Sequence, residues 1–174
     1  MRTKVPFFIL LFAIVGWPLA VQAQEIDLPD YTTDQRWTRA ARFSVNGQVM
    51  FISFGKDQGM SVAEIGKWIG NFYKQGWTEG PREPSAAVVA FYRNQKVFPT
   101  GEMEVIEVSD DAVTVRFNRP HLLVFGDDMV HYGVTVDEYE EVWMITQDVI
   151  GDWIGLDLDQ RIDGNWWYIT FKKK

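Results

Sequence analysis

The chain contains no cysteine and only two histidines among its 174 residues. The lack of cysteine excludes disulfides, thiol nucleophiles, thiolate metal ligands and covalent haem attachment. The fold must therefore be held together by packing alone. A domain of about 150 residues can achieve this, because it buries roughly two thirds of the surface of its unfolded chain.

Positive charge is also scarce. Seventeen Lys and Arg residues stand against 24 Asp and Glu residues, and the formal net charge is −7. A domain this acidic lacks the excess of positive charge that is typical of proteins that bind nucleic acid or anionic lipid. The sequence also contains no Gly-x-Ser-x-Gly nucleophile elbow and no phosphate-binding or dinucleotide-binding glycine motif. These absences argue against nucleic-acid binding, serine hydrolysis and nucleotide binding.

The longest apolar run lies at the N-terminus. Arg2 and Lys4 precede an almost unbroken apolar stretch over residues 5–19. This order is typical of a secretory signal peptide, and small residues at the end of segment 1–23 suit cleavage there. A run of about 15 residues is shorter than the roughly 20 that span a bilayer. We therefore predict a cleaved signal peptide, no membrane anchor after processing, and a periplasmic or secreted domain over residues 24–174.

Capping boxes predict three helix starts, because a hydroxyl side chain precedes a Gln or Glu by three positions at Thr32, Ser61 and Thr135. The first helix is ambiguous over residues 43–53, since the Asn46-Gly47 pair within it also suits a hairpin turn. We favour a helix there because the cap precedes it. A further helix is expected over residues 85–96.

Two features of these helices carry specific expectations. Gly66 and Gly70 lie four positions apart on the second helix, which leaves one smooth face and favours close packing against another helix. On the helix that begins at Thr135, the acidic residues Glu138, Glu140 and Glu141 are expected to face solvent.

Two hairpins are expected towards the C-terminus. Residues 103–108 and 112–117 form the first, and residues 156–162 and 165–171 form the second. The order of elements is helix, helix, helix, hairpin, helix, hairpin. It predicts an α+β domain with a four-stranded antiparallel sheet built from two hairpins and covered by about four helices. The hairpins should join through one pair of strands, and the sequence does not show which strands are central.

A family resemblance is carried by the stretch from Trp37 to Trp77. Within it, Gly59-Met60-Ser61 leads into the segment Glu64–Gly70. With Phe117-Asn118-Arg119-Pro120 and the closing hairpin, this stretch resembles two groups of small bacterial α+β proteins: the 2-amino-thiazoline-carboxylate hydrolase-like proteins and the four-vinyl-reductase-type ligand-binding domains. The resemblance implies a domain that encloses small organic molecules, for binding in some members and for hydrolysis in others. The predicted export and the lack of cysteine depart from that pattern, so no metal cluster, thiol chemistry or catalytic residue is carried over.

Both histidines lie in a polar segment between the first hairpin and the last helix. His121 and His131 could bind a metal with a carboxylate, although their spacing of ten positions is unlike that of usual ligand pairs. Alternatively, one of them acts as a general base beside Asp127 or Asp128, while Arg119 stabilises developing negative charge. A third interpretation is that the two aspartates form a turn and the histidines are ordinary, partly buried side chains.

Aromatic residues are the main compositional excess, with eight tryptophans. They could pack one large core, or they could line an apolar pocket. Such a pocket is expected between the sheet and the second and fourth helices, near the Arg119–His121 loop. The candidate ligand-binding residues are Trp68, Tyr73, Tyr92, Asn118, Tyr132 and Trp143.

Three functions are consistent with these patterns. The first is binding of a small, mainly apolar organic molecule by an exported soluble domain. The second is a hydrolase, lyase or isomerase that acts on such a molecule with a His–Asp pair. The third is an accessory subunit of a periplasmic complex, with a protein as partner. The sequence identifies no cofactor.

Overall fold

The structure is a computed structural model that describes residues 30–174, so the predicted signal peptide lies outside the described residues. In chain order the helices are α1 (Thr33–Asp57), α2 (Val62–Tyr73), the 3-10 turn η1 (Lys74–Gly76), α3 (Pro84–Gln95), α4 (Leu122–Phe125) and α5 (Val136–Trp153). The strands are β1 (Met103–Val108), β2 (Ala112–Asn118), β3 (Val130–His131), β4 (Val134–Thr135), β5 (Leu156–Asp163) and β6 (Trp166–Lys173). Within residues 30–174, none of these helices is both long enough and apolar enough to cross a membrane.

The three predicted capping boxes start α1, α2 and α5. In each, the hydroxyl of Thr32, Ser61 or Thr135 accepts a hydrogen bond from the backbone N–H three residues on, and the Gln or Glu there accepts one from the backbone N–H of the cap. Helix α1 runs without a break through Asn46 and Gly47. The helical interpretation of residues 43–53 is therefore confirmed.

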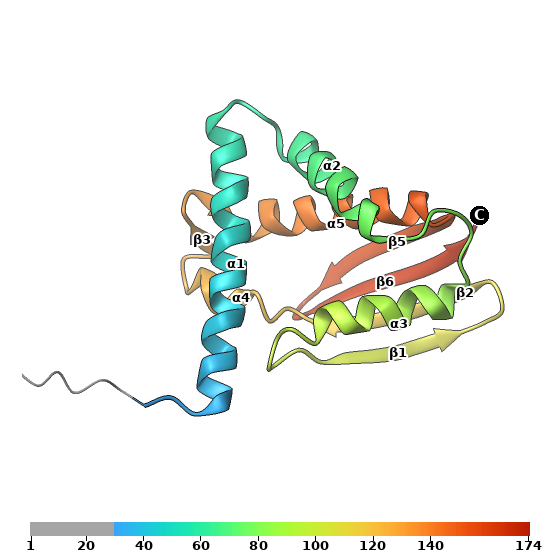
Figure 1. Cartoon of the computed structure of the whole chain (residues 1–174), viewed down its shortest axis with the longest axis horizontal. Coiled ribbons are helices and arrows are strands. Elements are labelled where there is room, and N and C mark those ends of the chain that lie inside the picture. The colour runs from blue at the N-terminus through green and yellow to red at the C-terminus, as the bar shows by residue number, and fades with distance from the viewer. Residues whose placement is uncertain (1–29) are drawn as a thin grey trace, which may run out of the picture. The chain divides into compact units, whose positions relative to one another are not determined.

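The predicted α+β architecture is confirmed, with about five helices packed on a four-stranded antiparallel sheet. The strand order is β1-β2-β6-β5, so the two hairpins join through β2 and β6 (Figure 1). Burial alternates along both central strands, which gives the sheet one packed face and one solvated face. Helix α3 covers the packed face, where the Phe91 ring lies 5.4 Å from that of Phe117 and 5.8 Å from that of Phe171.

The second layer is helical, with α2 packed along α5 (Figure 1). Gly66 and Gly70 face α5, as their spacing predicted. A Cβ added at Gly66 would lie 2.8 Å from the Cβ of Ile145, and one added at Gly70 would lie 2.7 Å from the Cβ of Val149. The two glycines therefore allow the helix backbones to approach closely. Trp143 of α5 packs against both the helical core and the sheet core.

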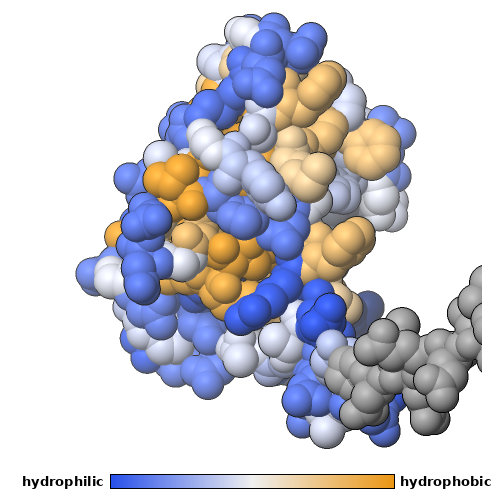
Figure 2. Space-filling model, turned by 90° about the vertical axis from the view of Figure 1, so that its left-hand side faces the viewer, coloured by the Kyte–Doolittle hydropathy of each residue, from blue (hydrophilic) through white to orange (hydrophobic). Residues whose placement is uncertain are grey.

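Helix α1 has an apolar side facing the core and a second apolar side facing solvent. Val45, Val49 and Ile52 are fully buried. Phe43 and Phe54 remain 81% and 61% exposed. Figure 2, viewed from the α1 side, shows apolar side chains at the surface among hydrophilic ones. Burial in the core therefore accounts for only one side of α1.

The segment between β2 and α5 is more ordered than we predicted. It contains the single turn of α4 and the short β3–β4 pair, in which Tyr132 and Gly133 form the connection. Their φ angles of 48° and 71° are both positive, as a two-residue type I′ turn requires. These elements are two to four residues long, too short to produce a periodic sequence pattern.

Candidate functional site

A cavity of about 410 Å³ lies where the sheet, α3, α5 and the end of α2 meet. Its volume is within the range of small-molecule sites, which is about 300–1,000 Å³. The walls are mainly apolar and include nine aromatic side chains, from Tyr73, Trp77, Phe91, Phe98, Phe117, Tyr139, Trp143, Trp167 and Phe171. Of the other lining residues, Gly76, Asn94 and Val97 are exposed, so the cavity opens to solvent near the ends of α2 and α3. Such walls suit an apolar or aromatic guest.

The polar side chains in the cavity wall are amides, hydroxyls, indoles and the imidazole of His121. Among the described residues, those that line the cavity include no Asp, Glu, Lys or Arg. Two wall residues carry fully buried polar atoms without a hydrogen-bond partner among the described residues: the indole Nε1 of Trp167 and the amide Oε1 of Gln147. The side chain of Trp143 interacts with the hydroxyl of Tyr139. Because the two unpartnered atoms are fully buried, a guest in the cavity meets instead the accessible amide groups at its opening, such as that of Asn94.

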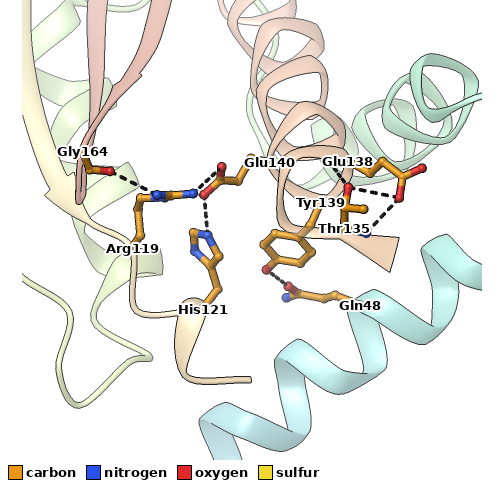
Figure 3. A network of polar contacts seen from close by, with 8 residues as sticks. All are labelled: Gln48, Arg119, His121, Thr135, Glu138, Tyr139, Glu140 and Gly164. Atoms are coloured by element: carbon orange, nitrogen blue, oxygen red, sulfur yellow. Dashed lines mark hydrogen bonds and ion pairs between the residues drawn. The ribbon is translucent and has the colours of Figure 1, made fainter. Parts of the chain in front are cut away.

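Next to the cavity, Arg119, Glu140 and His121 converge (Figure 3). Arg119 follows β2 and grips the Glu140 carboxylate with two hydrogen bonds, Nε to Oε1 at 2.5 Å and Nη2 to Oε2 at 2.8 Å. Its third nitrogen, Nη1, donates to the carbonyl of Gly164 at 3.1 Å. The Nε2 of His121 lies 2.7 Å from Glu140 Oε1. His121 lines the cavity. Glu140, which contacts His121, and Arg119 do not line it.

The ionised form of Glu140 is favoured despite its burial. Its side chain is only 4% exposed. Burial acts to raise its pKa, but the hydrogen bonds and charges of His121 and Arg119 outweigh this and hold the pKa of the Glu140 carboxyl below its usual value. An ionised carboxylate can only accept hydrogen bonds, so the proton between it and His121 is on Nε2. In neutral His121 the Nδ1 atom is then an acceptor.

The expectation that Glu140 faces solvent is wrong. Glu140 follows Val136 by four positions and precedes Trp143 by three, and this spacing places it on the buried stripe of α5. That spacing was the available signal, and the neighbouring Glu138 and Glu141 obscured it. The carboxylate beside a histidine is therefore Glu140, and Asp127 and Asp128 are exposed residues of the turn after α4.

A second buried polar contact lies in the cavity wall. The hydroxyl of Tyr139 donates to Gln48 Oε1 at 2.5 Å, which ties α5 to α1 (Figure 3). Burial raises the pKa of Tyr139, so the phenol stays neutral across the physiological pH range. We did not predict Gln48 as a site residue, because a lone glutamine on a helix carries no sequence signal.

The structure separates the two histidines. His131 lies on β3, where its Nε2 is 2.8 Å from Asn46 Oδ1 of α1, and it does not line the cavity. Its ring lies 4.3 Å from that of Tyr132 and 6.3 Å from that of Phe125. His131 thus contributes to packing of the β3–β4 pair against α1. Among residues 30–174, no group of three or more His, Asp or Glu side chains is placed to hold a metal ion.

Of the six predicted ligand-binding residues, Tyr73 and Trp143 line the cavity. Asn118 instead fixes the end of β2, since its side chain bonds the backbone N–H of Glu102 and the carbonyl of Thr100. Tyr132 is exposed in the turn between β3 and β4, and Tyr92 lies on the surface of α3 under the ammonium group of Lys96. Trp68 lies on α2, outside this cavity.

No protein-family model, no curated protein and no solved structure matches the chain.

Proposed function

We propose that this chain is an exported binding domain for a small, uncharged and mainly apolar organic molecule, held in the cavity between the sheet and α5. The observation that carries the proposal is the cavity wall, which is rich in aromatic side chains and, among the described residues, contains no Asp, Glu, Lys or Arg. Burying a charged guest there would cost several kcal/mol, because no Asp, Glu, Lys or Arg among the described residues lines the wall and the imidazole of His121 already contacts Glu140. The resemblance to small-molecule-binding α+β proteins remains a prediction that agrees with this function.

Catalysis is the second candidate, and His121 is the residue that favours it. A histidine held by a carboxylate at the edge of a cavity has the arrangement of a general base. However, both oxygens of that carboxylate are already bound by Arg119, and no Ser, Asp, Glu or Lys among the described residues lines the cavity beside His121 to act with it. Binding is therefore the better-supported function. If the protein converts its bound ligand, and His121→Gln abolishes this conversion but still binds the ligand, the protein is an enzyme instead.

Filling the cavity should abolish binding. Ile150 lines the cavity from α5, so Ile150→Trp adds an indole to its interior. We expect the neutral fluorophore N-phenyl-1-naphthylamine to bind the wild type with enhanced emission. Binding to Ile150→Trp should be at least about tenfold weaker, since the added indole and the probe need the same space. The matched control is Glu141→Trp, which places the same side chain on the exposed side of α5.

The titration excites the probe beyond the absorption of indole, so that neither added tryptophan interferes. Circular dichroism must first show that both variants are folded. If Ile150→Trp and Glu141→Trp bind the probe equally well, the cavity is not the binding site and the proposed function is wrong.

A further inference from the structure

A second cavity, of about 440 Å³, forms a groove between α1 and α2. It is walled on the α1 side by Gly47 and Phe51, and on the α2 side by Trp68 and Phe72. We call it the outer groove, and the cavity described above the inner cavity. The described residues that line the outer groove include no Asp, Glu, Lys or Arg, as in the inner cavity.

The two cavities are adjacent. Gln48, Tyr73 and Trp143 line both of them. A row of ring contacts also runs from one to the other: Phe51–Trp68 at 5.2 Å, Trp68–Phe72 at 6.1 Å, Phe72–Tyr73 at 5.8 Å, Tyr73–Trp143 at 6.0 Å and Trp143–Tyr139 at 6.2 Å. An apolar chain could therefore extend from the inner cavity into the groove along a continuous aromatic wall.

The aromatic side chains of the groove are unusually exposed. Trp68 is 52% exposed and Phe72 is 61% exposed, and Phe51 stacks on Trp68 while 41% exposed. Contiguous apolar surface of this kind marks interaction sites on soluble proteins. Figure 2 shows apolar groups of this face between hydrophilic regions. Because these side chains adjoin the inner cavity, one ligand that occupies both spaces would cover them.

We infer that the inner cavity and the outer groove form one bipartite site for an elongated, uncharged amphiphile, such as a long-chain or isoprenoid alcohol. This inference rests on the proposed function. The polar end of the ligand lies in the inner cavity, whose lining includes the uncharged polar side chains of Gln48, Asn94 and Gln95. The apolar chain lies against the aromatic wall of the outer groove.

The test uses a variant that blocks only the groove. A Cβ at Gly47 would meet no atom within 4 Å, and Gly47 lines the outer groove but not the inner cavity. Gly47→Trp should therefore fill the groove and leave the fold intact. The matched control is Met50→Trp on the same helix, at a position that is 57% exposed and lines neither cavity.

The readout is displacement of N-phenyl-1-naphthylamine by primary alcohols of six to twelve carbons. In the wild type and in Met50→Trp, affinity should rise by up to about fourfold for each added methylene along the whole series. In Gly47→Trp the rise should stop at a shorter chain, so that dodecanol binds at least about tenfold more weakly than to the wild type. Dodecanoate should bind the wild type at least about tenfold more weakly than dodecanol, because no Lys or Arg among the described residues lines either cavity and His121 already contacts Glu140.

Several outcomes overturn the inference while the proposed function survives, because the probe still binds the inner cavity. They are an unchanged chain-length dependence in Gly47→Trp, and a carboxylate that binds as tightly as the alcohol. A third is a dimer in native mass spectra that Gly47→Trp dissociates, since the groove would then be covered by a second copy of this chain. Failure of the wild type to bind the probe at all would instead remove the proposed function itself.

Discussion

Replacing Arg119 with alanine should lower the free energy of unfolding by about 3–5 kcal/mol, because it leaves the buried charge of Glu140 without its bidentate partner. Glu140 is 4% exposed and Arg119 is 12% exposed at their side chains, so water cannot take the place of the lost hydrogen bonds. Chemical denaturation monitored by circular dichroism measures the change. The free energy of unfolding of Arg119→Lys should lie between those of the wild type and Arg119→Ala. Lysine keeps the positive charge but cannot form the two parallel hydrogen bonds to the carboxylate.

The matched control is Lys172→Ala, which removes an exposed ion pair whose atoms lie 3.6 Å apart. This substitution should lower the free energy of unfolding by no more than about 1 kcal/mol. The double variant Arg119→Ala/Glu140→Leu should recover part of the loss, because no uncompensated charge then remains. Equal effects of Arg119→Ala and Lys172→Ala would show that the buried ion pair does not stabilise the fold.

Adding one methyl group at Gly70 should also destabilise the protein, by about 1–3 kcal/mol. The new Cβ would lie 2.7 Å from the Cβ of Val149 and 3.1 Å from the carbonyl oxygen of Thr146. Both atoms belong to or adjoin the backbone of α5, so a change of side-chain rotamer cannot relieve the contact, and α2 must move away. Thermal and chemical unfolding of Gly70→Ala measure this cost.

Gly47→Ala is the matched control, because it makes the same substitution in the interior of a helix where the added Cβ meets nothing within 4 Å. Helix propensity alone should make it more stable by about 0.5–1 kcal/mol. The two substitutions should therefore change stability in opposite directions. A gain of stability in Gly70→Ala would contradict the close packing of α2 on α5.

Local sequence signals were sufficient to predict the main elements of this fold. The hydroxyl-to-acid or hydroxyl-to-amide spacing at Thr32, Ser61 and Thr135 gave three helix starts, because the capping box depends only on neighbouring residues. The alternating apolar residues of the two hairpins likewise reflect local preferences, although the second hairpin turns at Gly164 and Asn165, one residue later than the expected Asp163-Gly164, since Asp163 pairs with Trp166. The order of the strands depends on contacts between distant segments, and the sequence did not show it.

The charged part of the candidate site was harder to predict, since it depends on residues far apart in the chain. Arg119 and His121 were recognised as candidates, but the carboxylate was assigned to the nearby Asp127 or Asp128. The carboxylate in contact is Glu140, 19 positions after His121. Its burial is a tertiary effect, since the helix alone would place an acid in solvent, and His121 and Arg119 together compensate for its burial.

The cavity depends on tertiary packing even more strongly. Tyr73 and Trp143 were predicted to line a pocket because each lies on the apolar stripe of a helix. Residues such as Gln48 and Gln147 reach the same space from α1 and α5, but nothing in their local sequence indicates this. Trp68 and Tyr92 share the helical stripes of their neighbours, yet they lie half-exposed outside the inner cavity.

Mass spectrometry of protein purified from its own host tests most directly whether the inner cavity holds an uncharged organic molecule. Spectra are recorded under native and then denaturing conditions for the wild type and for Ile150→Trp. We predict a bound mass on the native wild type that denaturation releases as a neutral, mainly apolar compound, and no such mass on Ile150→Trp. A bound mass that persists on Ile150→Trp, or a released metal ion or charged ligand in place of the neutral compound, would contradict the proposed function.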